Sequence, residues 1–214
     1  MKKIAFFDLD GTVLRGISSE KAFFFYLLRK RYIGPKQFFC YWAFILRWFP
    51  KYKFLTFIKN KAYLTGLSKD EITKLAEKFV VENLLKKLRP DLMVRIEEHM
   101  KAKDLVVLLT GAPAFLAKVF AKHLGIDEVQ PTRCVHLYDK FSHLPPTQNP
   151  FAKEKLEIAE KLCGQHEVNI KDCAAYGNSI YDATLLKAVG QAVAVTPDRR
   201  LRKVAKKHGW EIVD

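Results

Sequence analysis

Two aspartates separated by one residue, Asp8 and Asp10, directly follow an apolar run near the start of the chain, in the stretch FFDLDGTVL. In an extended segment, side chains at positions i and i+2 lie on the same face, so these two carboxylates are held together. Such a pair repels unless a cation lies between the two groups or one of them holds a proton. A divalent metal ion removes this conflict, while Gly11 permits a sharp backbone turn and Thr12 adds a hydroxyl. A surface turn at Asp-Gly is the alternative for this stretch taken alone.

Two further apolar runs end in polar residues. Thr110 and Gly111 follow Leu108-Leu109, and a hydroxyl beside the free N–H groups of a helix start can bind phosphate, although a simple helix-capping threonine is the alternative. The run Ala175-Tyr176 ends in Gly177, Asn178 and, four residues after Asn178, Asp182, where helix capping is again the plain alternative. Three apolar runs that each end in polar residues are hard to attribute to chance if these ends meet at one edge of a sheet.

The elements that must position these residues are short apolar strands alternating with helical patterns. Alternation of this kind predicts an α/β fold with a doubly wound parallel sheet, in which ligands bind at the carboxyl ends of the strands. The predicted strands are Ile4–Leu9, Leu105–Leu109, Cys173–Tyr176 and Ala192–Val195. The predicted helices are Asp91–Lys101, Ala114–Leu124, Ala152–Cys163, Tyr181–Ala188 and Arg199–His208.

With these motifs in place, the chain resembles the haloacid dehalogenase (HAD) superfamily of hydrolases, in the subfamily (IB) of phosphoserine-phosphatase-like enzymes. The first motif of that superfamily, DxDGT, is met by Asp8, Asp10, Gly11 and Thr12, and the second, a strand ending in Ser or Thr, by Thr110. The third is a lysine upstream of the fourth, and the fourth, usually GDxxxD, is met as GNSIYD at residues 177–182.

The resemblance implies a Mg²⁺-dependent phosphatase that works through an aspartyl-phosphate. In this scheme Asp8 is the nucleophile, Asp10 is the general acid and base, and Thr110 and Lys155 hold the phosphoryl oxygens. An all-oxygen site beside a substrate phosphate suits Mg²⁺. The implied metal site comprises Asp8, Asp10, Asn178 and Asp182, and the implied phosphate site comprises Asp10, Gly11, Thr12, Thr110, Gly111 and Lys155.

The motif lysine has two candidates in this chain, and one motif-four position departs from the family pattern. Lys153 and Lys155 both precede the fourth motif; the family's lysine lies 22 residues before the motif-four glycine, which selects Lys155 and leaves Lys153 as the alternative. Asn178 stands where the family usually has an aspartate. An amide oxygen can bind Mg²⁺ but brings no charge, so we expect weaker metal binding.

The segment between the first two motifs differs in composition from the rest of the chain. Residues 15–65 hold 11 Lys or Arg, one acid (Glu20) and 16 of the 27 aromatic residues, which is +10 of the formal net charge of +14. The predicted helices here are Lys21–Lys30, Gln37–Phe49, Tyr52–Leu64 and Lys69–Val81, with breaks at Gly34-Pro35, Pro50 and Gly66 and a capping box from Ser68 to Glu71. We therefore predict a helical-bundle cap domain at residues 16–87, inserted into a core of residues 1–15 and 88–214.

The apolar run at residues 38–46 is nine residues long, too short to span a membrane, which takes about 20. A cap core, a basic face that meets anionic lipid or a bulky phosphorylated substrate, and a nucleic-acid surface are the alternatives, the last without a supporting motif.

The expected partner is a phosphorylated small molecule or lipid, and the expected location is the cytoplasm, with contact at the inner membrane surface as an extension. True phosphoserine phosphatases carry a glutamate nine residues after the nucleophile, where this chain has Ile17, and Glu20 is out of register. Phosphoserine is therefore not the expected substrate. A lipid phosphate is the alternative, because related lipid phosphatases share the aromatic, basic character of the cap.

The cysteines, Cys40, Cys134, Cys163 and Cys173, show no metal-ligand spacing and suit reduced thiols, and the short apolar run after the two N-terminal lysines does not suit a signal peptide. Two alternatives are not hydrolases. One is a response-regulator receiver, although receivers lack a 70-residue cap after the first strand. The other is a membrane- or nucleic-acid-binding protein on an inactive hydrolase scaffold.

Overall fold

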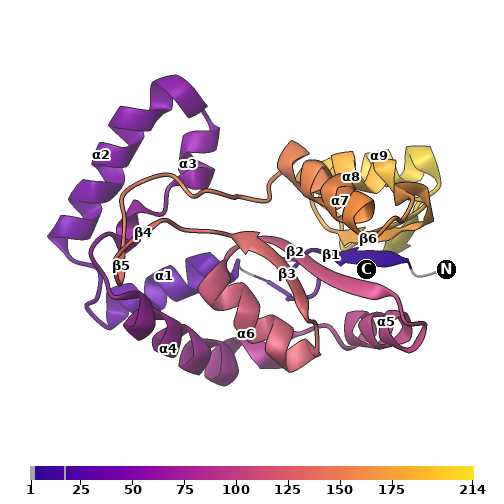
Figure 1. Ribbon diagram of the computed structural model, residues 1–214, viewed down its shortest axis with the longest axis horizontal. Helices are drawn as coiled ribbons and strands as arrows, with labels where there is room; N and C mark the ends of the chain where they lie inside the picture. Colours follow the sequence, from indigo (N-terminus) through magenta and orange to yellow (C-terminus); the bar gives the residue numbers. More distant parts are fainter. Residues whose placement is uncertain (1–2, 17) are drawn as a thin grey trace.

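The computed structural model describes residues 3–16 and 18–214 and contains a six-stranded sheet with every neighbouring pair parallel, in the order β3-β2-β1-β6-β7-β8 (Figure 1). The order runs outward from β1 in both directions, so the chain reverses at the β1/β6 boundary, where such sheets bind ligands. The predicted doubly wound fold is confirmed. The strands are β1 Ile4–Phe7, β2 Leu105–Pro113, β3 Glu128–Thr132, β4 His136–Leu137, β5 Lys140–Phe141, β6 Ala174–Gly177, β7 Gln191–Val195 and β8 Glu211–Val213.

Alternate residues of each central strand enter two separate apolar cores. Phe7 and Leu108 belong to the cluster that contains residues of α5 (Pro90–Lys101) and α6 (Ala114–Leu124). Phe6 and Val107 belong to the cluster on the other face, under α7 (Lys153–Gln165), α8 (Ala183–Ala188) and α9 (Arg199–His208). This period of two is the pattern of strands covered by helices on both faces.

The inserted segment is helical, and its first four helices are α1 (Ser19–Arg29), α2 (Pro35–Tyr52), α3 (Leu55–Lys59) and α4 (Lys69–Phe79). Helices α2 and α3 form a hairpin that projects from the body, whereas α1 and α4 lie beside α6 (Figure 1). Phe23 of α1 packs against Phe79 at 5.5 Å and against Phe115 of α6 at 5.6 Å between ring centroids. One apolar cluster therefore joins α1 and α4 to the sheet, while most of the α2–α3 hairpin stands outside it.

Two predicted helix boundaries in this segment are wrong. Pro50 does not end α2, because it lies in the last turn, where the missing N–H removes one hydrogen bond and the helix ends at Tyr52 anyway. The predicted helix Tyr52–Leu64 divides into α3 and the short 3₁₀ helix η1 (Ala62–Leu64). Asn60 separates the two helices, because its backbone is extended. Its side-chain oxygen accepts a hydrogen bond from Ala62 N, a donor that the first turn of η1 leaves free.

The predicted capping box at Ser68 forms only in part. Ser68 Oγ accepts a hydrogen bond from Glu71 N at 3.3 Å, but the Glu71 carboxylate instead accepts one from Tyr32 Oη at 2.9 Å. Ser68 Oγ also donates to Asp139 Oδ2. Asp139 belongs to the turn between β4 and β5, so this hairpin closes over the start of α4.

Other differences from the predicted elements are smaller. After α4 the chain continues through a π-helical turn at Val80–Leu84 and a 3₁₀ turn at Leu85–Lys87, and two further 3₁₀ turns lie at Ile170–Asp172 and Ile180–Asp182. All four cysteines are free, with Cys163 and Cys173 buried and the other two half-buried. Within the residues that the structure describes, no helix is long and apolar enough to cross a membrane.

Candidate active site

The side chain of Asp8, directly after β1, lies beside a buried lysine. Lys155 Nζ donates to Asp8 Oδ1 at 2.7 Å and to Asp182 Oδ1 at 2.5 Å, and Asp8 N donates to the carbonyl of Tyr176 on β6. The three charged side chains are 7%, 11% and 6% exposed for Lys155, Asp8 and Asp182. The first, third and fourth sequence motifs therefore meet at the carboxyl edge of the sheet.

Lys153, the alternative to Lys155, lies elsewhere. Its side chain is 83% exposed and forms a helix-surface ion pair with Glu157 at 3.3 Å. Two residues along an α-helix turn the side chain by more than half a revolution, so only one of the two lysines can face the sheet edge. Lys155 is the one that reaches the aspartates.

Asp10 lies in the turn after β1, and its side chain reaches the start of α1. Its Oδ1 accepts a hydrogen bond from Ser19 N at 2.9 Å, a backbone donor that the first turn of a helix leaves free. Burial raises the pKa of Asp10, while the bond from Ser19 acts in the opposite direction. A carboxyl group with a raised pKa holds a proton more readily, which suits a proton donor.

Gly11 and Thr12 shape the turn between the aspartates and the fourth motif. Gly11 has φ +89°, and a Cβ there would lie 2.1 Å from Asn178 Nδ2, so only glycine fits. Thr12 Oγ1 lies 3.1 Å from Asp8 Oδ2 and 3.4 Å from Asn178 Oδ1. The Thr12 hydroxyl thus gathers an oxygen of Asp8 and an oxygen of Asn178 around one point.

Thr110 ends the regular pairing of β2 and is 1% exposed. Its hydroxyl accepts a hydrogen bond from Ala112 N at 3.1 Å. The register Phe7↔Leu108 brings Thr110 to the same edge as Asp8, and the carbonyl of Gly111 accepts a hydrogen bond from Thr132 Oγ1. The second motif is therefore a hydrogen-bonded turn at the same sheet edge as the paired aspartates.

The electrostatics of this edge are dominated by burial and by Lys155. Burial raises the pKa of Asp8 to about 7, although Lys155 acts to lower it. The pKa of Lys155 is raised because Asp182 and Asp8 outweigh the effect of its burial, so the lysine stays charged. One lysine thus faces two carboxyl groups, with Asp10 nearby, so the carboxyl groups outnumber the cation.

This excess suits a hard cation with oxygen ligands, the donor set that Mg²⁺ prefers. Among residues 3–16 and 18–214, no group of three or more His, Cys, Asp or Glu side chains forms a metal cluster. The available donors are instead mixed: the Asp8 carboxylate, the Asn178 amide oxygen and backbone carbonyls. Asp182 is already engaged, because its Oδ1 accepts from Lys155 and its Oδ2 accepts from Asn178 N and Ser179.

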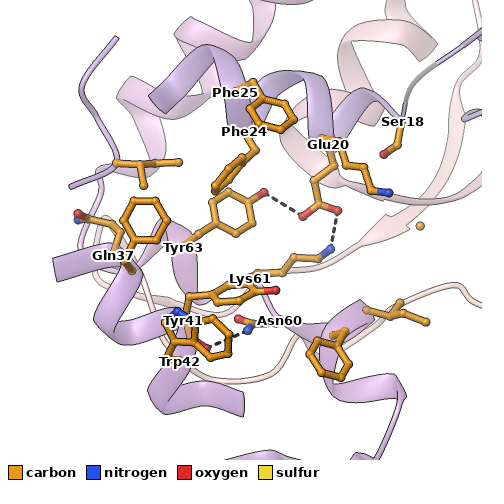
Figure 2. A pocket seen from close by; sticks show the side chains of 16 residues that line it. Ser18, Glu20, Phe24, Phe25, Gln37, Tyr41, Trp42, Asn60, Lys61 and Tyr63 are labelled. Atoms are coloured by element: carbon orange, nitrogen blue, oxygen red, sulfur yellow. Dashed lines mark hydrogen bonds and ion pairs between the residues drawn. The ribbon is translucent and has the colours of Figure 1, made fainter. Parts of the chain in front are cut away.

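A pocket of about 690 Å³ lies between α1, the α2–α3 hairpin and Gly111 (Figure 2). Glu20 in this pocket accepts hydrogen bonds from Lys61 Nζ at 2.5 Å and from Tyr63 Oη at 2.9 Å. The partners of Glu20 lie 41 and 43 residues away in the chain and carry no motif, so they could not be found from the sequence. Ile17, the position compared with the phosphoserine-binding glutamate, lies outside the described residues.

Comparisons with known proteins show the family of the chain. The model of the haloacid dehalogenase-like hydrolase family matches residues 5–187. Phosphoserine phosphatase SerB1 of Mycobacterium tuberculosis is 28% identical over 98% of this chain and 70% of its own length. Histidinol-phosphatase of Neisseria meningitidis is 24% identical over 100% of this chain and 99% of its own length.

Solved structures share the fold. A Bordetella pertussis protein of unknown function superposes with a TM-score of 0.81 at 21% identity, covering 100% of this chain and 99% of that one. A substrate-bound phosphoserine phosphatase gives a TM-score of 0.68 at 16% identity, covering 100% and 93%. The family match spans most of the chain, which sets aside the response-regulator reading, and the predicted resemblance is confirmed: the chain belongs to the haloacid dehalogenase-like hydrolases.

Proposed function

We propose that the chain is a Mg²⁺-dependent phosphomonoester hydrolase that works through an aspartyl-phosphate intermediate. One observation carries the proposal: the Asp8 carboxylate ends the central strand and is held between Lys155 and the Thr12 hydroxyl. One Asp8 oxygen bonds to each of these groups, so the carboxylate has a defined orientation. A buried, oriented carboxylate next to a cation is suited to attack a phosphorus atom.

The proposed reaction has two displacements. Asp8 attacks phosphorus and forms an O–P bond while the ester P–O bond breaks, and Asp10 gives its proton to the leaving alkoxide. Asp10, now ionised, then takes a proton from the water that attacks the phosphoryl group, which releases inorganic phosphate and restores Asp8. General acid and base catalysis of this kind contributes on the order of 10²–10⁴-fold per step.

The remaining residues bind charge. Lys155 and Thr110 hold the phosphoryl oxygens, together with the turn at Gly11, Thr12 and Gly111. Asp182 orients Lys155, because its other oxygen is occupied by the loop at residues 178–179. Mg²⁺ would be held by Asp8, the Asp10 carbonyl and Asn178, with Asp182 behind them, and when bound it neutralises phosphate charge and keeps Asp8 ionised.

The test is the release of p-nitrophenol from p-nitrophenyl phosphate, with Mg²⁺ and with EDTA. Turnover should require Mg²⁺, and Asp8→Asn should abolish it because an amide is not a nucleophile. Circular dichroism of the variant controls for folding. Turnover by Asp8→Asn above a few per cent of wild type would exclude Asp8 as the nucleophile, and absence of turnover by the wild type would favour the inactive-scaffold alternative.

We further propose that residues 16–87 act as a cap on the core of residues 1–15 and 88–214, and that the cap contacts an anionic membrane from the cytoplasm. The observation that favours this contact is an exposed apolar stripe along α2, formed by Phe38, Trp42, Leu46 and Phe49 at helical spacing. Leu46 is 80% exposed and Trp42 61%. Monomeric proteins rarely leave such a stripe in water without a partner.

The charge around the stripe supports an anionic partner. No acidic residue occurs between Lys21 and Lys69, and Arg47, Lys51 and Lys53 are exposed near the tip of the hairpin. Each basic residue near an anionic lipid surface contributes on the order of 1 kcal/mol, and salt weakens the attraction. Aromatic side chains with neighbouring basic residues suit the interface of an anionic bilayer.

Co-sedimentation with vesicles tests this contact. We expect binding to phosphatidylglycerol vesicles at low salt, loss of binding at high salt, and no binding to phosphatidylcholine vesicles. Equal failure to bind both vesicle types would contradict the proposal. Self-association at low salt, measured by analytical ultracentrifugation, would instead assign the stripe to a second copy of the chain.

A further inference from the structure

We propose that the leaving group of the substrate is a mainly apolar alcohol without a positive charge, and that it occupies the pocket under the α2–α3 hairpin. This inference rests on the proposed phosphatase function and names its substrate class. The pocket reaches Gly111, next to Thr110, and Ser18, next to the residue that binds Asp10. A phosphate at Asp8 would therefore leave its alcohol pointing into this space.

The walls of the pocket are mostly apolar. The apolar and aromatic lining residues are Phe24, Phe25, Ile33, Phe38, Tyr41, Trp42, Phe57, Ile58 and Tyr63. The volume of about 690 Å³ is typical of sites for ligands much larger than serine. An alcohol with several methylene groups or an aromatic ring would bury its surface against these side chains.

Most polar lining groups are already paired within the protein, whereas the exposed Lys21, which also lines the pocket, has no ion pair among the described residues. The Glu20 carboxylate is bound by Lys61 and Tyr63, whose residues are 6% and 5% exposed. Gln37 accepts from Gly34 N and donates to the carbonyl of Thr65. Asn60 likewise has both ends of its amide bonded, to Tyr41 and Ala62.

This pairing disfavours a positively charged leaving group. Figure 2 shows Glu20 facing Lys61 and Tyr63, so the carboxylate that could attract an ammonium group is neutralised by a lysine 2.5 Å away. Burial, with the nearby Glu20 charge, raises the pKa of Tyr63 well above its ordinary value, so Tyr63 stays a neutral donor. The ammonium group of a zwitterion such as the serine of phosphoserine would lose water here and find no free carboxylate, because Glu20 is the acidic residue of the lining and is already bound.

The pocket is also continuous with the outer surface. Phe38, Trp42 and Phe57 line it and are nevertheless 44%, 61% and 47% exposed. An apolar chain longer than the pocket could leave past these side chains without crossing a polar rim. The alcohol could thus belong to a membrane lipid or to a free apolar compound, since both present the same chemistry.

A chain-length series tests the inference. Phosphate release is measured for n-alkyl phosphates from ethyl to decyl, kept below their micellar concentrations, and kcat/KM is compared. Each buried methylene should raise kcat/KM roughly fourfold until the pocket is full. A charged analogue, 6-aminohexyl phosphate, should have a kcat/KM at least about tenfold below that of hexyl phosphate, because its ammonium group must be desolvated near Lys61.

Neighbouring phenylalanines provide matched variants. Phe38 lines the pocket, whereas Phe39 is 74% exposed and is not among the lining residues. Phe38→Ala should flatten the chain-length dependence, whereas Phe39→Ala should keep the full dependence. Lys61→Met should narrow the gap between hexyl and aminohexyl phosphate, because Glu20 is then free to meet the ammonium group.

Two further measurements distinguish a lipid substrate from a free compound, and failure of this inference from failure of the proposed phosphatase function. Faster release from dodecyl phosphate in phosphatidylglycerol vesicles than from monomers would assign a lipid, and preference for monomers would assign a free compound. Turnover with no chain-length dependence, or with aminohexyl phosphate preferred, overturns the inference and leaves the phosphatase intact. If no phosphate ester is hydrolysed, the proposed function fails; calorimetric binding of hexylphosphonate over aminohexylphosphonate would then still support the pocket's preference, and equal or reversed binding would overturn it.

Discussion

Replacement of Lys155 by methionine measures what the buried lysine contributes at the edge of the sheet. Lys155 Nζ lies 2.7 Å from Asp8 Oδ1 and 2.5 Å from Asp182 Oδ1, and the three side chains are almost fully buried. Methionine keeps most of the volume and removes the charge. Removal of one partner from a buried ion pair leaves an uncompensated charge and costs about 3–5 kcal/mol. We expect a loss of this size in the free energy of unfolding, together with loss of phosphatase activity.

Lys153→Met is the matched control on the same helix. Its side chain is 83% exposed and its only ion pair among the described residues is the one with Glu157 at 3.3 Å, four residues along. Exposed helix pairs of this spacing contribute about 0.3–0.5 kcal/mol. The control should therefore change the free energy of unfolding by about a tenth of the Lys155→Met effect and leave activity unchanged.

The pH dependence of the stability loss tests the same reasoning independently, because its direction can be predicted. Burial raises the pKa of Asp8 to about 7 from 3.8 even with Lys155 present, so its ionisation opposes folding above the unfolded value. Without Lys155 that pKa rises further, and the cost is relieved as pH falls and Asp8 takes up a proton. Lys155 has a raised pKa, so its own contribution is fully present below its unfolded pKa and is lost only at alkaline pH. The difference between variant and wild type should thus shrink from about pH 8 to about pH 5.5.

Urea denaturation in EDTA at both pH values measures this, since EDTA removes any metal contribution. Equal stabilities of Lys155→Met and Lys153→Met at the higher pH would refute the reasoning. A difference that grows as pH falls would also refute it, because protonation of Asp8 can only reduce the cost of the missing cation.

Three further outcomes are expected. Asn178→Asp should lower the Mg²⁺ concentration for half-maximal activity by adding charge to the site; an unchanged or higher value would contradict this. Gly11→Ala should destabilise by about 1–3 kcal/mol from backbone strain and more from contact with Asn178, whereas Gly16→Ala, at φ +90° with no atom within 4 Å, should show the strain alone; urea denaturation compares them. Leu46→Asp should weaken co-sedimentation with phosphatidylglycerol vesicles severalfold without changing p-nitrophenyl phosphate turnover, and equal loss of both would indicate misfolding.

The fold class and the chemistry-bearing strand ends could be predicted from the sequence because both depend on local patterns. Short apolar runs alternating with helical periods indicate a doubly wound sheet, and parallel strands bring their carboxyl ends to one edge. Asp8, Thr110 and Asn178 could be assigned to that edge in this way. The edge strands β3 and β8 were missed because they are only partly buried and carry polar residues, so their apolar periodicity is weak.

Long-range packing decided the rest. Helical spacing alone cannot tell which face of α7 turns inward, so the buried environment of Lys155 and the exposure of Lys153 appear only in the tertiary structure. The same holds for Glu20, whose partners lie 41 and 43 residues away and meet it only because the chain breaks at Asn60 and folds η1 back toward α1. Local sequence therefore determined which groups could do chemistry, whereas the character of the pocket beside them followed from contacts between segments far apart in the chain.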